Sequence, residues 1–260
     1  MSAIDTRLPG LLKGGQPLAG MFVGLPSPAL VEMAGYAGFD FVIIDNEHGP
    51  QSLETTEHMI RAARCANTLP IVRTAEADIL RVLDAGASGV QVPSVESADA
   101  ARRIVEACRY PPLGRRSSAF TARAGGYTFF GGAAQIKRAN EGTAIVLMVE
   151  SVEAVRNLGE ILAVPGIDCI FVGLSDLALS MGHPGDNMHP RVQESLADIF
   201  NRAKTARVAS GVLASTPGDF NRYASMGATY LPMTMATVIG GALREAIAMR
   251  KGARVAAERR

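Results

Sequence analysis

The segment FVIIDNEHGP (residues 41–50) joins an apolar run to a cluster of charged side chains, and the same arrangement returns in VLMVES (146–151) and IFVGLSDLALSMG (170–182). Short runs rich in Val and Ile are typical of buried parallel strands. The loops that follow such strands usually carry the chemistry of the protein. We therefore interpret Glu150 and Asp176 as residues that strands place at a common site.

Eight such runs can be read along the chain, and a segment with helical periodicity follows most of them. The expected strands lie near 19–24, 40–45, 69–73, 88–93, 144–150, 168–173, 210–214 and 228–233. The expected helices lie at 28–37, 53–64, 78–84, 98–109, 152–162, 192–208, 218–226 and 238–250. This alternation predicts an α/β fold, a (β/α)8 TIM barrel that the whole chain (1–260) forms as a single domain. A doubly wound open sheet is the alternative, although GLPSPAL after the first strand lacks the Gly-rich phosphate fingerprint of that class.

The composition is that of a folded protein with a large core, because 48% of the residues are hydrophobic and 20% are charged. The formal net charge is +1, and no basic stripe with interleaved aromatic residues indicates nucleic acid as a partner. No apolar stretch has the length of a membrane span or the pattern of a secretory leader, so we expect neither a membrane partner nor secretion. The cysteines (Cys65, Cys108 and Cys169) have no metal-binding spacing, which favours reduced thiols and a cytoplasmic location.

Two segments exceed what a minimal barrel requires. YPPLGRRSSAFTARAGGYTFFGGAAQIKRANEG (110–142) is a long insertion rich in Gly and Arg. Such an insertion is either a substrate lid or subunit contact, with Arg116 and Arg123 as candidate residues, or a surface excursion with solvated arginines. VIGGALREAIA (238–248) has a broad apolar face behind a Gly-Gly pair, which could let a last helix swing away from its own barrel.

Glu150 and Asp176 end two successive expected strands, and neighbouring strand ends of a barrel lie side by side. Both carboxylates could then reach one ion. Two carboxylates with open positions suit Mg²⁺ or Mn²⁺, whereas a zinc site would recruit His or Cys. The structural alternative is helix capping, by Asp176 before LALSMG and by Ser151 after Glu150.

Charged side chains at two other strand ends suggest a base and an anion clamp. His48 follows Asp45 and Glu47, anions that would hold one imidazole tautomer, so it is a candidate general base. The alternative is a solvated loop histidine. Arg73 ends the run PIVR and can hold an anionic oxygen with two donors, or else form an ion pair with Asp45 or Glu47.

The turn before Asp176 offers backbone donors. Gly173, Leu174 and Ser175 lead into a helix, so their N–H groups could bind a carboxylate. Schiff-base chemistry is disfavoured, because none of the lysines (Lys13, Lys137, Lys204 and Lys251) ends an expected strand. No nucleophile elbow is present either. What remains is metal-assisted enolate chemistry.

These residues together resemble the HpcH/HpaI aldolase family of metal-dependent pyruvate aldolases. AGFDFVIIDNEHGP (37–50) is similar to the family's Gly-Phe-Asp, apolar run and Asp-x-Glu-His segment. The similarity continues through IVR (71–73), LDAGASGVQVPSVESADAARRIVEACRYPPLGRRS (83–117), VLMVES and FVGLSDLALSMGHPG (171–185), and it covers about residues 18–235. Several independent motifs in the same order make the resemblance specific.

The resemblance implies roles for the candidate residues and a barrel of the phosphoenolpyruvate/pyruvate type. Glu150 and Asp176 would bind Mg²⁺ or Mn²⁺, with Co²⁺ as a further candidate. The other implied roles are Arg73 on the keto-acid oxygen, His48 as base positioned by Asp84, and the backbone of Gly173, Leu174 and Ser175 on the substrate carboxylate.

This chain departs from the family pattern at three places. Met148 stands where members often have Gln, and Leu174 stands where they often have Pro. The segment from Arg73 to Asp84 is shorter than usual.

The resemblance also implies an activity and an assembly. The activity is that of a class II aldolase, which reversibly cleaves a 4-hydroxy-2-oxo acid to pyruvate or hydroxypyruvate and an aldehyde. The implied assembly is a homo-oligomer, a trimer or hexamer, in which the last helix packs on a neighbour and segment 110–142 lies near a subunit seam. Two alternatives are a citrate-lyase-β-like lyase acting on a CoA thioester, for which no adenine or pyrophosphate site is evident, and a non-catalytic keto-acid-binding or assembly protein.

Overall fold

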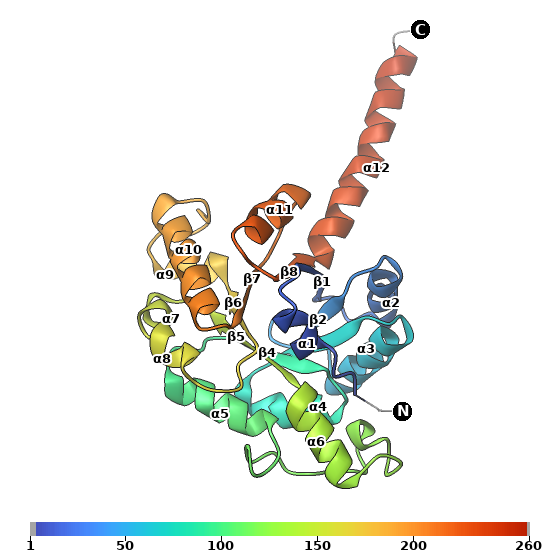
Figure 1. Cartoon of the computed structure of the whole chain (residues 1–260). Helices are drawn as coiled ribbons and strands as arrows, with labels where there is room; N and C mark the ends of the chain where they lie inside the picture. Colours follow the sequence, from blue (N-terminus) through green and yellow to red (C-terminus); the bar gives the residue numbers. More distant parts are fainter. Residues whose placement is uncertain (1–3, 259–260) are drawn as a thin grey trace.

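The computed structural model describes residues 4–258, with side chains for residues 4–248. Eight parallel strands form a closed barrel in which each strand pairs with the next along the chain and the last pairs with the first. Helices surround the strands (Figure 1). The predicted (β/α)8 TIM barrel is therefore confirmed, and the open doubly wound sheet was the wrong alternative.

The strands differ from their predicted bounds by two residues at most. They are β1 (Leu18–Val23), β2 (Phe41–Asp45), β3 (Leu69–Arg73), β4 (Gly89–Val92), β5 (Ala144–Val149), β6 (Cys169–Val172), β7 (Ala209–Val212) and β8 (Tyr230–Thr234). The α-helices are α1 (Leu8–Lys13), α2 (Pro28–Tyr36), α3 (Leu53–Cys65), α4 (Ile79–Asp84), α5 (Ala98–Cys108), α6 (Gly132–Gly142), α7 (Val152–Arg156), α8 (Leu158–Leu162), α9 (Leu174–Ser180), α10 (Pro190–Thr205), α11 (Pro217–Ser225) and α12 (Met235–Glu258). Two 3-10 turns are η1 (Glu76–Asp78) and η2 (Arg123–Gly125).

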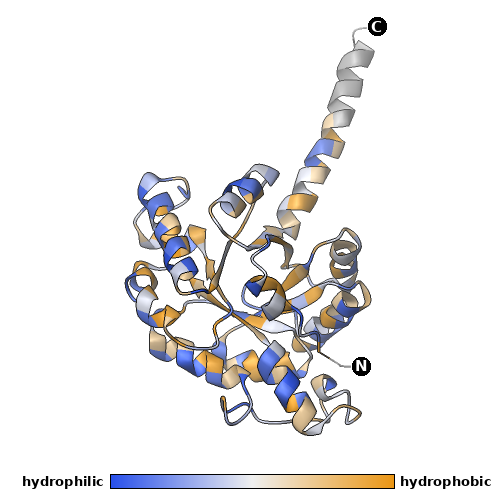
Figure 2. Ribbon diagram, viewed as in Figure 1, coloured by the Kyte–Doolittle hydropathy of each residue, from blue (hydrophilic) through white to orange (hydrophobic). Residues whose placement is uncertain are grey.

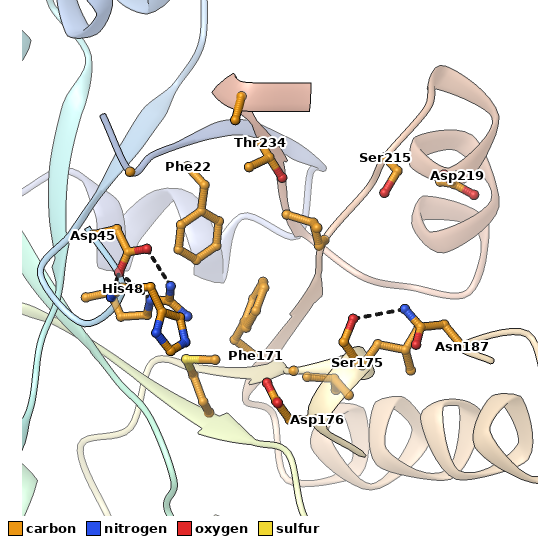
Figure 3. Close-up of a pocket in the computed structure, with 18 of the residues that line it drawn as sticks. Phe22, Asp45, His48, Phe171, Ser175, Asp176, Asn187, Ser215, Asp219 and Thr234 are labelled. Carbon is orange, nitrogen blue, oxygen red and sulfur yellow. Dashed lines mark hydrogen bonds and ion pairs between the residues drawn. The ribbon is translucent and has the colours of Figure 1, made fainter. Parts of the chain in front are cut away.

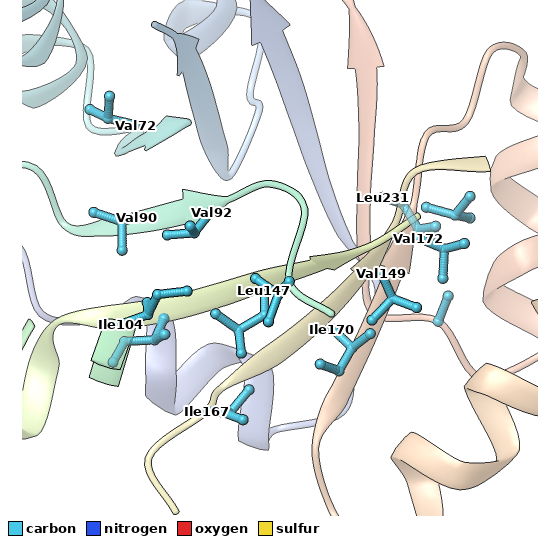
Figure 4. Packing of buried hydrophobic residues seen from close by; sticks show 14 of the residues in the cluster. Val72, Val90, Val92, Ile104, Leu147, Val149, Ile167, Ile170, Val172 and Leu231 are labelled. Atoms are coloured by element: carbon cyan, nitrogen blue, oxygen red, sulfur yellow. The ribbon is translucent and has the colours of Figure 1, made fainter. Parts of the chain in front are cut away.

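The pleat of the strands divides the core into two layers. Alternate side chains such as Phe41 and Ile43 fill the inside of the barrel. Leu8 and Leu12 of α1 belong to the same inner cluster. The intervening side chains point outward to the helices, and Figure 4 shows several of them, among them Val90 and Leu147, packed together. Since both faces of every strand are buried, polar side chains are accommodated mainly where the strands end.

Several helices begin directly after a strand-end loop because a hydroxyl caps them. The side chains of Ser27, Ser52, Ser97, Ser151 and Thr216 each accept a hydrogen bond from a backbone N–H in the first turn of α2, α3, α5, α7 and α11. Such caps contribute about 1 kcal/mol each. The predicted capping role of Ser151 is thus observed.

The insertion 110–142 packs against the end of α4. The guanidinium of Arg116 is buried, donates to Asp84 Oδ1 at 2.8 Å and lies over the ring of Tyr110. Arg123 donates to the carbonyl of Ala85 at 2.9 Å. The alternative of solvated arginines is therefore wrong for Arg116. At the outer side of the insertion, the ring of Phe129 is 85% exposed.

The last helix, α12, does not lie along the barrel wall as an eighth helix normally does. It projects away from the barrel beyond α11 (Figure 1). Its exposed apolar side chains include Val238, Leu243 and Ile247. The ribbon of α12 shows hydrophobic and hydrophilic residues interspersed along its described part (Figure 2). Within residues 4–258, no helix has the length and hydropathy that a bilayer crossing requires.

A buried hydrogen bond inside the barrel gives a test of the fold. Tyr230 Oη donates to Gln91 Oε1 at 3.1 Å, and both side chains are fully buried. Tyr230→Phe leaves that acceptor unpaired, so we expect the free energy of unfolding to fall by about 1–3 kcal/mol in urea denaturation. The matched control Tyr36→Phe alters a side chain that is 74% exposed and should cost less than about 0.5 kcal/mol. Equal effects of the two substitutions would contradict a stabilising role for the buried pair.

Candidate active site

The carboxyl ends of the strands open into a cavity of about 640 Å³ (Figure 3). Apolar side chains, among them Phe22, Phe171 and Leu213, form part of its wall. The polar lining residues are Asp45, His48, Arg73, Ser175, Asp176, Asn187, Ser215, Asp219, Tyr223 and Thr234. The mouth of the barrel is therefore where the polar side chains at the strand ends converge.

Strand register brings Asp45 and Arg73 together. They are partners across β2 and β3, and each ends its strand at an inward-facing position, two residues beyond Ile43 and Ile71. Arg73 Nε donates to Asp45 Oδ1 at 2.8 Å, and Nη2 donates to Oδ2 at 2.5 Å. The pair is a bidentate contact of the strong type.

Arg73 has a second acidic partner. Its Nη1 lies 3.1 Å from an oxygen of Glu47, and its guanidinium lies over the ring of Phe22. Burial alone would raise the pKa of Asp45, but the hydrogen bonds and charge of Arg73, with the backbone N–H groups of His48 and Glu47, lower it below its usual value. The ion-pair alternative for Arg73 is therefore what the structure shows, and two carboxylates compensate its charge.

His48 lies in the loop after β2. Its backbone N–H donates to Asp45 Oδ1 at 3.3 Å, and its imidazole Nε2 lies 3.9 Å from Glu47. The side chain is 71% exposed and faces the cavity beside Asp45 (Figure 3). A proton-transfer group in this place can reach a substrate without rearrangement of the barrel.

Asp84 does not position His48 within this chain. It is the last residue of α4, which returns toward the start of β4, so it lies at the opposite end of the barrel from the strand-end loops. Its carboxylate accepts from Arg116, in contact with the insertion. The contact that the resemblance implied was therefore wrong for the single chain, because a helix end and a strand end belong to opposite faces of the barrel.

Glu150 immediately follows β5 and is held from one side. Its Oε1 accepts from the backbone N–H of Ser94 at 2.6 Å and lies 3.3 Å from Ser94 Oγ. Burial raises the pKa of Glu150, and the negative charges of Asp176 and Glu47 raise it further, against the opposing effect of the Ser94 N–H. Asp176 and Glu47 thus both lie close enough to act on the charge of Glu150.

The N-terminus of α9 brings Asp176 to this group. Asp176 lies in the first turn of α9, and the N-cap residue, Gly173, makes no side-chain cap. The capping alternative for Asp176 is therefore wrong. A Cβ on Gly173 would come within 2.4 Å of Glu150 Oε2, so glycine leaves the room that the Glu150 carboxylate occupies.

The backbone donors before Asp176 are not equivalent. The N–H of Gly173 donates to the carbonyl of Val149 at 3.2 Å. It is therefore engaged in the barrel and not free for a substrate carboxylate, contrary to expectation. Leu174 and Ser175 are the first two residues of α9 and line the cavity, so their N–H groups belong to the unpaired first turn of a helix.

The carboxylates fit a divalent ion of the Mg²⁺ type. Oxygen ligands from one or two carboxylates, completed by water and substrate, are how proteins usually hold Mg²⁺. In the described part of the chain, no group of three or more His, Cys, Asp or Glu side chains has the arrangement of a complete metal site. Glu150 and Asp176 would thus supply part of a coordination shell, and a cation there would offset their mutual repulsion.

Sequence reasoning missed three residues of the site. Ser94, which follows β4 and has φ of +56°, holds Glu150 in place. Its polar side chain at a strand end was a usable signal. Asn187 lies in the loop after α9, and no local pattern marked it. Asp219 lies in the first turn of α11, where Thr216 and Asp219 form a capping pattern that was a usable signal.

Comparison with known proteins places this geometry in a family. Residues 18–237 match the model described as HpcH/HpaI aldolase/citrate lyase. A 2-dehydro-3,6-dideoxy-6-sulfogluconate aldolase of Pseudomonas putida is 37% identical over 220 residues, which are 84% of this chain and 86% of that protein. A 4-hydroxy-2-oxo-heptane-1,7-dioate aldolase of Shigella sonnei is 34% identical over 258 residues, 98% of each.

A solved structure agrees. The HpcH/HpaI aldolase/citrate lyase family protein from Burkholderia cenocepacia J2315 superposes with a TM-score of 0.90 at 32% identity, and the match covers 95% of this chain and 100% of that one. The resemblance inferred from the motifs is confirmed: this chain belongs to the HpcH/HpaI aldolase/citrate lyase family and is an aldolase, a carbon–carbon lyase.

Proposed function

We propose that the chain reversibly cleaves a 4-hydroxy-2-oxo acid into pyruvate, or hydroxypyruvate, and an aldehyde, with Mg²⁺ or Mn²⁺ as cofactor. The observation that carries the proposal is the arrangement of Asp176, His48 and Arg73 around one cavity, with Glu150 directly after β5 and against Gly173, the residue before α9. The names of the relatives, which are aldolases of oxo acids, support it.

Glu150 and Asp176 would hold the ion, which when bound supplies Lewis-acid polarisation of a keto oxygen. The N–H groups of Leu174 and Ser175 would bind the carboxylate of the oxo acid. Arg73 would orient the keto oxygen and stabilise the charge that develops on it. Phe171 and the neighbouring apolar wall would keep water from the reacting carbons.

His48 would act as the base for cleavage. It accepts the proton of the C4 hydroxyl, the C4–O bond becomes the carbonyl of the aldehyde, and the electron pair of the C3–C4 bond moves to C3 to form an enolate. Protonation at C3 then gives pyruvate. In the synthetic direction the same steps run in reverse, so the enolate carbon adds to the aldehyde and the new hydroxyl oxygen receives the proton.

We also propose that the chain works as a homo-oligomer, a trimer or hexamer. The support is the exposed apolar surface of α12 and of the insertion around Phe129, which a single chain leaves in water. A neighbouring subunit would cover it.

The first prediction concerns the metal ligands. Glu150→Gln keeps the shape but removes a charge, so kcat/KM for pyruvate release should fall at least about a hundredfold. Dialysis against EDTA should abolish activity, and Mn²⁺ or Mg²⁺ should restore it. The control Glu153→Gln alters a nearby exposed carboxylate that pairs with Arg156, and it should keep the wild-type rate. Full turnover in chelated buffer would contradict metal dependence.

The second prediction distinguishes the role of His48 as the base from the role of Arg73 in binding the oxo acid. His48→Ala should lower kcat about a hundredfold or more while KM changes little, because the proton is transferred only in the transition state. Arg73→Lys should raise KM for the oxo acid and lower kcat, since a single ammonium cannot reproduce the bidentate contact with Asp45. Both variants are measured by steady-state kinetics of oxo-acid cleavage. An unchanged kcat in His48→Ala would show that His48 is not the base.

The third prediction concerns assembly. Light scattering at micromolar concentration should give a multiple of the 27.3 kDa chain mass. Leu243→Glu combined with Ile247→Glu should lower that mass, because charges then interrupt the exposed apolar face of α12. Glu245→Lys on the same helix is the control. A fully active monomer would contradict the proposal.

A further inference from the structure

The cavity continues beyond the reacting groups into a second polar region. In Figure 3, Asn187, Ser215 and Asp219 lie on the side of the cavity opposite Asp45 and His48, with the apolar rings between the two groups. Asn187 comes from the loop between α9 and α10, Ser215 from the β7–α11 connection, and Asp219 from the first turn of α11. The chemistry proposed above assigns none of these three a role.

Asn187 presents an unsatisfied polar atom. Its Nδ2 donates to Ser175 Oγ at 3.0 Å, whereas its Oδ1 is buried without a partner. The loop around it is tied down, because Gln193 donates to the Asn187 carbonyl at 2.5 Å. A buried acceptor without a donor is unfavourable. Because Asn187 lines the cavity, a small rotation of its side chain would present Oδ1 to a ligand hydroxyl, which would then be bound with selectivity.

Asp219 presents a fixed negative charge. Thr216 Oγ1 donates to its carboxylate at 2.9 Å and accepts from its backbone N–H at 3.0 Å, as the cap of α11. Within the described side chains, no lysine or arginine forms an ion pair with Asp219. Its carboxylate therefore lines the cavity with a hydroxyl donor but without an ion-pair partner among the described side chains.

The cavity has no spare cation. Arg73 is the one lysine or arginine among the described lining residues, and Asp45 and Glu47 already neutralise it. Arg222, near the outer region, lies behind Met188 and donates to Gln193. An aldehyde with a carboxylate, sulfonate or phosphate group would thus be repelled by the Asp219 carboxylate. No free lysine or arginine among the described lining residues would compensate the negative charge of the aldehyde.

We infer that Asn187 and Asp219 select the aldehyde, so that the enzyme uses neutral aldehydes that bear hydroxyl groups and discriminates against anionic ones. This inference rests on the aldol chemistry proposed above. Asn187 supplies attraction for a hydroxyl, and Asp219 accepts a hydroxyl while it repels an anion. Specificity of this kind combines a favourable contact with a repulsive one.

The experiment is aldol synthesis from pyruvate by the metal-loaded full chain with three aldehydes of similar length. D-Glyceraldehyde is neutral and hydroxylated, butanal is neutral without hydroxyls, and succinic semialdehyde is anionic. We expect kcat/KM for glyceraldehyde to exceed that for succinic semialdehyde at least about tenfold. Asp219→Asn should reduce that ratio about tenfold, and Asn187→Ala should reduce the ratio of glyceraldehyde to butanal about tenfold.

The matched control is Asp99→Asn, which removes a carboxylate from the first turn of the capped helix α5, far along the chain from the cavity. It should leave both ratios unchanged. Ratios within one variant are insensitive to partial misfolding. Wild-type preference for succinic semialdehyde, or an Asp219→Asn ratio equal to that of the control, would overturn the inference.

A separate measurement keeps the inference distinct from the proposed function. Exchange of the C3 protons of pyruvate in D₂O, followed by NMR without aldehyde, reports enolate formation alone. Exchange with unaltered aldehyde ratios would overturn the selection by Asn187 and Asp219 and leave the aldolase chemistry standing. No exchange and no aldol product would overturn both.

Discussion

A closed parallel barrel must fill its interior with apolar side chains, and this packing requirement decides where its polar groups can lie. On β2 the inward positions read Phe41, Ile43 and Asp45, so the first polar residue appears only where the strand reaches the mouth. Arg73 stands at the same level on β3. Because all strands are parallel, every such residue emerges on one face. The geometry of the closed sheet is thus sufficient to bring these charged residues together at one end of the barrel.

That concentration leaves an excess of negative charge at the mouth. Arg73 compensates Asp45 and Glu47 in part, whereas Glu150 is held by Ser94 and by the space beside Gly173, with no ion pair to a described lysine or arginine. Burial raises the pKa of Glu150, and the charges of Asp176 and Glu47 add to the effect. A site preorganised in this way is suited to a divalent cation, since its charge would turn an unfavourable cluster into a ligand set.

The fold could be predicted from the sequence because hydrophobic periodicity and hydroxyl caps are local signals, and the strand-end positions of Asp45, Arg73 and Glu150 followed from the strands. Asp84 could not be placed, because a motif match does not say which face of a barrel a residue occupies. The role of Ser94 depends on a left-handed backbone and on a partner 56 residues away. The helix α6 was missed although residues 133–141 are rich in helix formers, because glycines flank them on both sides and give the whole insertion the composition of one Gly-rich segment.

Residues at the strand ends line one part of the cavity, and residues from the connecting segments line the other. This arrangement affects which aldehyde the enzyme would accept. Asp45 and Arg73 are anchored by the barrel through register and burial, so their geometry depends on the whole fold. Asn187 depends instead on a loop that Gln193 fixes, and Asp219 on the helix start that Thr216 caps after the β7–α11 loop. Such loops tolerate substitution without loss of the core. A barrel of this kind can therefore keep one bond-breaking step and change the aldehyde that it accepts, through residues that no strand pattern reveals.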